Sequence, residues 1–382
     1  MIVTVAQAVG AWGMFVYTSG ATVVARDLGV PTAYIGYQVG TAYFFAMLCS
    51  LFSSTTTRQI GYVQSLALSM FAIAAGAYLT TIWYLTGMAA GSILMGLGFG
   101  LIPAASTRLL MSVTTENRRA FIFSIKQSGI PFGGLLAAVI TPLVTEQIGW
   151  RWAGYVIVVM GLLLSIILIL HNERWNIVER ETRPISYNPL NPIRVIFRSR
   201  ALSLLIYMSI CYISIQIIWW TYLSPFLVED LNFGLVEAGT FLAVIQITGI
   251  FGRPFWGWLA DVLQDNLTAM AILGLIMSVC CMVTPFLTPD TPKILLYVLS
   301  ILIGISAVSW NGVFHAALLQ AAPKGDTIQV IAGMAFFVYV AMFAWPVGFA
   351  IAIQITGNYP MTIAIFSIVG LVGTYCAWKV KS

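Results

Sequence analysis

Residues 150–170 read WRWAGYVIVVMGLLLSIILIL, and after Arg151 this run contains no charged side chain. A helix needs about 20 mainly apolar residues to cross the hydrocarbon core of a bilayer. Similar stretches fill most of the 382 residues, of which 60% are hydrophobic and only 8% are charged. A soluble domain is about 25% charged. Lipid must therefore form much of the surroundings of this chain, and the sequence predicts a multi-pass membrane protein.

Directly after this run comes the only long polar segment of the chain, 171–200. It includes a stretch rich in proline and asparagine, 184–192. We expect a cytoplasmic linker here, between an N-terminal six-helix half, 1–170, and a C-terminal six-helix half, 201–382. Internal duplication of this kind is common in secondary transporters.

The hydrophobic segments predict an all-α membrane protein with twelve transmembrane helices in two six-helix halves. Each segment is a long apolar run bounded by short polar or glycine-containing stretches, as expected for membrane-spanning helices. The expected helices are 3–25, 34–56, 62–81, 83–112, 119–143 and 150–170 in the first half, and 201–226, 236–259, 267–287, 293–321, 328–353 and 358–379 in the second.

The basic residues are distributed unevenly between the two sides of the membrane. With both termini inside, the inner loops and tail hold twelve Lys or Arg residues and the outer loops hold three. Cytoplasmic loops of membrane proteins carry an excess of Lys and Arg. We therefore expect both termini in the cytoplasm and the protein in the cytoplasmic (inner) membrane. The net charge of +5 is explained by these basic residues of the inner loops and tail, and it gives no reason to expect a nucleic-acid partner.

The C-terminal half contains the string GRPFWGWLAD at 252–261, at the predicted cytoplasmic end of its second helix. The part GWLAD, 257–261, resembles the loop signature of the major facilitator superfamily, a G-x-L-A-D run followed by basic residues. Here Val-Leu-Gln-Asp, 262–265, stands where the basic residues are expected. In the N-terminal half, only Arg58 and Gly61 fit the equivalent loop.

A further match is KQSGIPFGG at 126–134, followed by GWRW at 149–152. These strings resemble the K-Q-x-G-x-x-x-G-G and G-W-R patterns of bacterial members of the superfamily, similar to cyanate- and nitroimidazole-type permeases. The antiporter motif of the family has two residues between Pro and Gly-Gly, whereas this chain has one, Phe132. An antiport mechanism is therefore not implied, although the layout of the whole chain resembles the superfamily.

The resemblance implies a rocker-switch mechanism, in which the two halves tilt around a central site. Asp261 would stabilise the cytoplasmic closure against helix N-termini and Arg253, because a carboxylate interacts favourably with the dipole at a helix N-terminus. Gly257, Arg58 and Gly61 complete this candidate gating set. The alternative is that Asp261 and Arg253 only cap and anchor their helix.

Two basic residues approach the membrane interior, whereas all thirteen acids fall in loops or near helix ends. Lys126 is about two turns into the fifth predicted helix, roughly 10 Å from its start, and Arg108 is near the cytoplasmic end of the fourth. A buried ammonium group needs a partner or loses its proton. An organic or inorganic anion is therefore the expected substrate. The alternatives are a structural role for Lys126, and for Arg108 either snorkelling to the interface or an ion pair with Glu116.

Uncharged and titratable residues complete the candidate substrate site. Asn311 and His315 are four residues apart and share a helix face. His315 could carry a proton near neutral pH, which makes a proton the candidate coupling ion, or it could be a hydrogen-bonded packing group. Tyr17 and Trp220 could line an aromatic cavity, and Gln127 adds a polar amide.

Other classes of function lack their expected features. The alternative transporter is an efflux pump for lipophilic compounds, which would use a buried acid to attract cations. An enzyme would need a clustered nucleophile, base or metal site, and no nucleotide-binding loop follows a strand. The five cysteines are odd in number and form no CxxC pair, so a disulfide or metal site is not expected. We expect a monomer in the lipid bilayer that binds a small anionic substrate, with neither cofactor nor bound metal.

Overall fold

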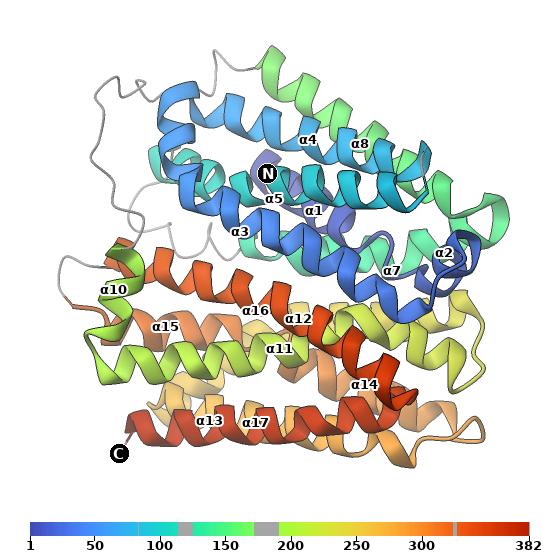
Figure 1. The fold of residues 1–382 in the computed structure, drawn as a ribbon. Coiled ribbons are helices and arrows are strands. Elements are labelled where there is room, and N and C mark those ends of the chain that lie inside the picture. Colours follow the sequence, from blue (N-terminus) through green and yellow to red (C-terminus); the bar gives the residue numbers. More distant parts are fainter. Residues whose placement is uncertain (83, 114–124, 172–190, 324–326, 382) are drawn as a thin grey trace. The chain divides into compact units, whose positions relative to one another are not determined.

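The computed structural model shows a helical protein made of two compact units, Met1–Tyr187 and Asn188–Ser382 (Figure 1). Every regular element in the part of the chain that the structure describes is a helix. Each unit has its own set of packed helices. The structure describes residues 1–82, 84–113, 125–171, 191–323 and 327–381.

The first unit is built from long apolar helices that pack against one another in pairs. Helix α4 packs on α5 and α8, α3 packs on α5, and α1 packs on α7. The helices of this unit are α1 (Ile2–Phe15), α2 (Ala21–Leu28), the 3-10 helix η1 (Thr32–Tyr34), α3 (Ile35–Ile60), α4 (Tyr62–Ile82), α5 (Leu85–Val113), α7 (Gly129–Ile148) and α8 (Trp150–Leu170). A helical turn at 125–127 precedes α7.

The second unit follows a similar plan. Helix α17 packs on α11 and α13, α12 packs on α14, and α16 packs on α10 and α11. The helices of this unit are α10 (Asn191–Phe197), α11 (Arg200–Glu229), α12 (Leu235–Leu263), α13 (Asn266–Met282), the 3-10 helix η3 (Thr284–Phe286), α14 (Lys293–Ala307), α15 (Asn311–Ala321), α16 (Thr327–Thr356) and α17 (Tyr359–Lys381).

The hydrophobic segments of the sequence correspond to these helices. Eleven described helical segments are long and apolar enough to cross a membrane, and the shorter α1 is apolar as well. They account for the twelve segments expected from the sequence, and the predicted 150–170 coincides with α8. The prediction of an all-α membrane protein is therefore confirmed.

The prediction of one continuous helix over 3–25 is wrong, because α1 ends at Phe15 and α2 begins at Ala21. The Thr18 hydroxyl donates to the Phe15 carbonyl oxygen at 2.8 Å, and the Ser19 hydroxyl donates to the same oxygen at 3.4 Å. Hydroxyl side chains that bond to nearby carbonyls compete with the helical backbone pattern. Hydropathy alone does not reveal this break, because the connecting residues are as buried as the helix itself.

Three other predicted segments differ in detail. The predicted helix 293–321 is divided into α14 and α15 by three residues, 308–310. Within the predicted linker 171–200, residues 172–190 lie outside the described part of the chain, and α10 packs on α16 through the edge-to-face pair Phe197–Phe337. The start of the predicted helix 119–143 also lies outside the described residues, and α7 continues five residues beyond its predicted end, to Ile148.

The paired glycines of the sequence are close-packing positions. A side chain at Gly96 would collide with the carbonyl oxygen of Ala42, and one at Gly100 would lie 2.9 Å from Cβ of Cys49. These contacts let α5 approach the backbone of α3 closely, as small residues do between membrane helices.

Candidate functional site

Lys126 lies in the helical turn before α7, and its side chain is buried, with 5% exposed. Its Nζ atom donates to the hydroxyl oxygen of Thr107, on α5, at 3.0 Å. Lys126 is the one charged residue classed as buried in the described ranges, and every Asp and Glu there is at least partly exposed. The first unit therefore places a basic side chain in its interior.

An amide pair lies next to this lysine. Gln7 on α1 donates through Nε2 to Oε1 of Gln127 at 3.3 Å. Glycines position the pair, because a side chain at Gly129 would lie 2.7 Å from the Thr4 carbonyl oxygen and 3.1 Å from Cβ of Gln7. Gly133 makes the same close approach to α1 one turn later. The string KQSGIPFGG thus combines polar residues with the glycines that bring α1 against them.

Arg253, on α12, is a partly buried cation in the second unit. Its Nε atom donates to the Val308 carbonyl oxygen at 3.3 Å, in the break between α14 and α15. The break provides this acceptor, because carbonyls at a helix end lack a partner within the helix. Helix α12, which carries Arg253, also packs on α15, which carries His315.

The predicted pair Asn311 and His315 shares one turn of α15. Nδ1 of His315 lies 2.6 Å from the Asn311 carbonyl oxygen. Asn311 and His315 therefore lie on a helix that packs on the helix of Arg253, a residue that the sequence had suggested only for the gating set. Trp220 is buried in α11, 3% exposed.

A buried polar pair near this break was not expected from the sequence. Nε1 of Trp310 donates to Oε1 of Gln216 at 2.9 Å, and both side chains are almost fully buried. The Trp310 ring also packs edge-to-face on Tyr212 at 5.9 Å. Buried Trp N–H groups usually find a hydrogen-bond partner. The signal in the sequence that could have pointed to this pair was Gln216, a glutamine within an apolar helix.

The loop signature lies at the end of α12. Asp261 is in the last turn of the helix and its carboxylate is exposed. The structure does not pair it with Arg253, eight residues earlier on the same helix and about 12 Å away along its axis. Gly257 has open space where a side chain would stand, whereas Gly252 lies against Ser309.

The equivalent loop of the first unit has one conformational requirement. Gly61 connects α3 to α4 with φ of 99°. Side chains disfavour that region, so glycine is the natural residue there. The side chains of Arg58 and Arg108 lie outside the described part of the structure.

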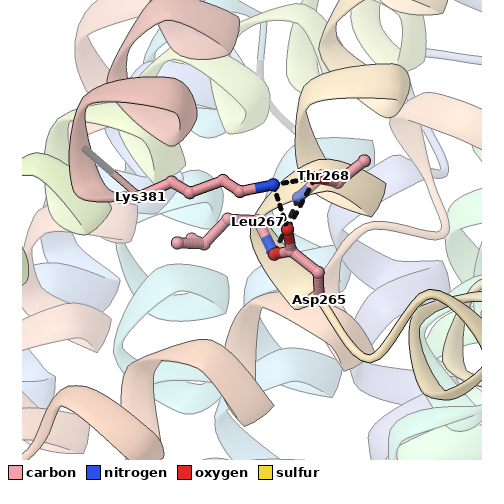
Figure 2. Close-up of polar contacts among 4 residues, drawn as sticks. All are labelled: Asp265, Leu267, Thr268 and Lys381. Carbon is pink, nitrogen blue, oxygen red and sulfur yellow. Dashed lines mark hydrogen bonds and ion pairs between the residues drawn. The ribbon is translucent and has the colours of Figure 1, made fainter.

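An ion pair follows the loop signature and was not predicted (Figure 2). Asp265 caps α13 by accepting from the backbone N–H groups of Leu267 and Thr268 at 2.9 and 3.2 Å. Nζ of Lys381, at the end of α17, lies 2.6 Å from Oδ2 of Asp265 and donates to the Thr268 hydroxyl at 3.1 Å. A basic residue therefore does reach this loop, but from the last helix of the chain.

Tyr17 lies apart from Lys126. It belongs to the turn between α1 and α2, where its hydroxyl bonds to that of Thr80 and its ring packs edge-to-face on Trp150 at 6.0 Å. Trp150 follows the C-terminal end of α7, whereas Lys126 precedes its N-terminal end, and twenty helical residues span about 30 Å. The aromatic cavity predicted around Tyr17 is thus not next to the lysine.

The described helices are those of a polytopic membrane protein. The described residues contain no group of three or more His, Cys, Asp or Glu side chains that could hold a metal ion. The chain belongs to the Major Facilitator Superfamily, whose family model matches residues 3–346.

Curated relatives are distant members of this superfamily. The chain is 23% identical to an uncharacterized MFS-type transporter of Bacillus subtilis, over 70% of this chain and 65% of the relative. It is also 23% identical to a probable hexose phosphate transport protein of Chlamydia pneumoniae, over 69% and 65%, and 22% identical to a probable chloroplastic anion transporter of rice, over 61% and 54%. The chain thus spans about two thirds or less of the length of these relatives.

Solved structures share the fold. A POT family transporter in complex with 5-aminolevulinic acid superposes with a TM-score of 0.80 at 14% identity, covering 100% of this chain and 96% of that one. A peptide transporter POT in complex with sulfate gives 0.78 at 14% identity, covering 100% and 93%. These similarities confirm the major facilitator fold, and the predicted likeness to cyanate- and nitroimidazole-type permeases stays a prediction.

Proposed function

We propose that this chain is a secondary transporter that moves a small anion across the cytoplasmic membrane by alternating access. The observation that carries the proposal is the buried ammonium group of Lys126, held by the Thr107 hydroxyl beside the Gln7–Gln127 amide pair. Charged residues in membrane segments commonly mark substrate or ion pathways.

The surroundings of Lys126 favour an anion over a cation as the substrate. The Thr107 hydroxyl and the Gln7–Gln127 amide pair can bond to an anion beside the ammonium group, and no Asp or Glu is buried in the described residues. A lipophilic cation would instead be attracted by a buried carboxylate. An anion would interact favourably with the ammonium group, and Gln127 could bond to its hydroxyl or carboxylate oxygens.

Similarity to known transporters supports the same class of substrate. Relatives named as a probable hexose phosphate transport protein, a probable anion transporter and a hexuronate transporter all take their names from anionic compounds or anions. In the orientation given by the Lys and Arg distribution, both termini lie in the cytoplasm. Arg253 and His315 are the candidate polar groups of the second unit, with a proton as the candidate coupling ion.

The test is substrate affinity of purified Lys126→Gln protein for a hexuronate, a hexose phosphate and inorganic phosphate, with the neutral hexose as comparison. Hydrogen bonds to a charged group contribute about 1.5–3 kcal/mol, so Lys126→Gln should weaken binding of the preferred anion by about 10- to 150-fold. Lys126→Arg should retain part of the affinity, because the charge survives with a different geometry.

The matched control is Lys293→Gln, which removes a surface lysine that pairs with Glu237 in the second unit. This variant should bind like the wild type. Normal anion affinity in folded, monodisperse Lys126→Gln would overturn the anion-site proposal. A neutral hexose that bound as tightly as its phosphate or uronate would also overturn it, because the charge would then make no contribution.

A further inference from the structure

A second polar feature lies in the first unit, away from Lys126. A cavity of about 530 Å³ is formed by α2, the end of α7 and the start of α8. Its lining includes Arg26, Asp27, Trp150, Arg151 and Trp152. None of these residues belongs to the candidate substrate or gating sets, although three of them come from the GWRW string.

The cavity is organised around Asp27. Oδ2 of Asp27 accepts a hydrogen bond from Nε1 of Trp150 at 2.9 Å and one from Arg151 at 2.7 Å. The hydrogen bond from Trp150 is the largest cause that holds the pKa of Asp27 below its usual value; burial opposes it, and the hydrogen bond and charge of Arg151 and the charge of Arg26 add to the lowering. Asp27 is thus ionised at neutral pH, and Arg151 is fixed in position.

Arg151 has a defined geometry. Its Nε atom donates to the Thr81 carbonyl oxygen at 3.2 Å, and its guanidinium carbon lies 4.5 Å from the centre of the Trp150 ring. Arg26 is different, because it is exposed and makes no hydrogen bond or ion pair within the described residues. Two arginines and one aspartate leave the cavity with one net positive charge.

The start of α8 adds to this positive potential. Gly149 precedes the helix with φ of 103°, and no side chain caps the first N–H groups. The N-terminus of a helix attracts anionic groups, phosphate above all. The glycine of GWRW therefore allows the turn that opens this helix end toward the cavity.

An apolar surface continues from the cavity along α8. Trp152, Val159, Leu163 and Ile166 are each more than half exposed and follow one another at helical spacing. Trp152 packs edge-to-face on Tyr155 at 5.5 Å. Tryptophan and tyrosine are enriched at the interface between lipid headgroups and hydrocarbon. This order of side chains is the one expected for a cavity at headgroup level followed by a stripe at acyl-chain level.

We propose that this cavity binds the phosphate of a phospholipid headgroup through Arg26 and Arg151, with an acyl chain along the exposed stripe of α8. The continuity of the cavity with a lipid-facing stripe favours a phospholipid over a free anion. The phosphate accepts hydrogen bonds from both guanidinium groups, which suit phosphate oxygens by their planar geometry. This site is separate from the proposed transport site.

The experiment measures thermal stabilisation of the full chain in detergent during titration with phosphatidylglycerol, phosphatidylcholine, diacylglycerol with the same chains, or inorganic phosphate. Bound lipid stabilises the folded state in proportion to its occupancy. Both phospholipids should stabilise the protein, whereas diacylglycerol and inorganic phosphate should have little effect. Arg26→Gln should raise the phospholipid concentration for half-maximal stabilisation about fivefold to tenfold, as expected for loss of a charged hydrogen bond at a partly exposed site.

The matched control is Arg198→Gln, which removes an exposed arginine of the second unit. It should leave the titration unchanged, and equal effects of the two variants would show non-specific attraction and overturn the proposal. Equal stabilisation by diacylglycerol would show that the phosphate is not recognised. Stabilisation by inorganic phosphate that Arg26→Gln abolishes would assign the cavity to a soluble anion and would also overturn the lipid proposal.

Discussion

Substitutions of Asp265 and Lys381 test whether their ion pair stabilises the packing of the end of α17 on the start of α13 (Figure 2). The pair is partly exposed, with 21% of the Asp265 side chain and 55% of the Lys381 side chain accessible. Exposed ion pairs contribute about 0.2–1 kcal/mol. The cap is worth more, since replacing an N-cap aspartate by alanine costs about 0.5–2 kcal/mol.

These values give an order for three variants. Lys381→Met should lower the free energy of unfolding by about 0.5 kcal/mol. Asp265→Ala loses both the cap and the pair and should cost about 1–2 kcal/mol. Asp265→Asn should fall between them, because asparagine is a good N-cap but carries no charge. The measurement is equilibrium unfolding in mixed detergent micelles at neutral pH.

Salt and pH separate the two contributions. The bond from Lys381, and then that from Thr268, lower the pKa of Asp265 to about 2. The pKa in the folded state is below the unfolded value of about 3.9, so the stabilisation is complete above about pH 4 and is lost as the pH falls through about 2. High salt should reduce the difference between wild type and Lys381→Met while leaving the cap. Equal stabilities of Asp265→Ala and Lys381→Met would refute this reasoning, because the cap would then contribute nothing.

Three further predictions concern gating, packing and topology. Asp261→Asn should slow transport in reconstituted vesicles while leaving substrate affinity nearly unchanged. Transport rates equal to those of the wild type would show that Asp261 only caps and anchors its helix. Trp310→Phe should cost about 1–3 kcal/mol because the Gln216 oxygen is left buried without its donor; adding Gln216→Leu should recover most of that loss, and strictly additive losses would contradict a direct coupling. Reporter fusions at Ser382 and within 184–192 should both report the cytoplasm, and a periplasmic signal at either place would break the proposed orientation.

Much of the fold could be predicted because lipid imposes a simple rule on the sequence. Backbone groups in hydrocarbon must be paired within a helix, so helix number and approximate length follow from apolar runs such as 150–170. Helix breaks do not follow from the same rule. The turn after Phe15 and the break at 308–310 are both buried in the fold. At the first, the Thr18 hydroxyl bonds to the Phe15 carbonyl oxygen, and at the second, Arg253 bonds to the Val308 carbonyl oxygen.

The candidate site was harder to predict because its contacts join distant parts of the chain. Lys126 could be singled out from its charge alone, and its burial in the structure agrees with that reasoning. Gln7, which bonds to the adjacent Gln127, is 120 residues away from it in the sequence. Lys381 is 113 residues away from Thr268, to which it donates. One sequence without covarying positions contains no signal for such pairs.

The two units repeat one packing scheme, and this repetition relates their polar groups. SILMG in α5 ends at Gly96 and SILIG in α14 ends at Gly304, and each glycine lies against a backbone carbonyl, of α3 and of α12 respectively.

Counted from those glycines, Thr107 and His315 both stand eleven positions later. Thr107 accepts the hydrogen bond of Lys126, from the helical turn before α7, whereas His315 lies on α15, which packs on α12, the helix of Arg253. The two units thus carry a polar residue at the same distance in sequence from their packing glycines, while the basic residue of each candidate site belongs to a different element. Because the two cations are not equivalent by position, replacing Lys126 and replacing Arg253 should give different phenotypes, even though both remove one interior positive charge.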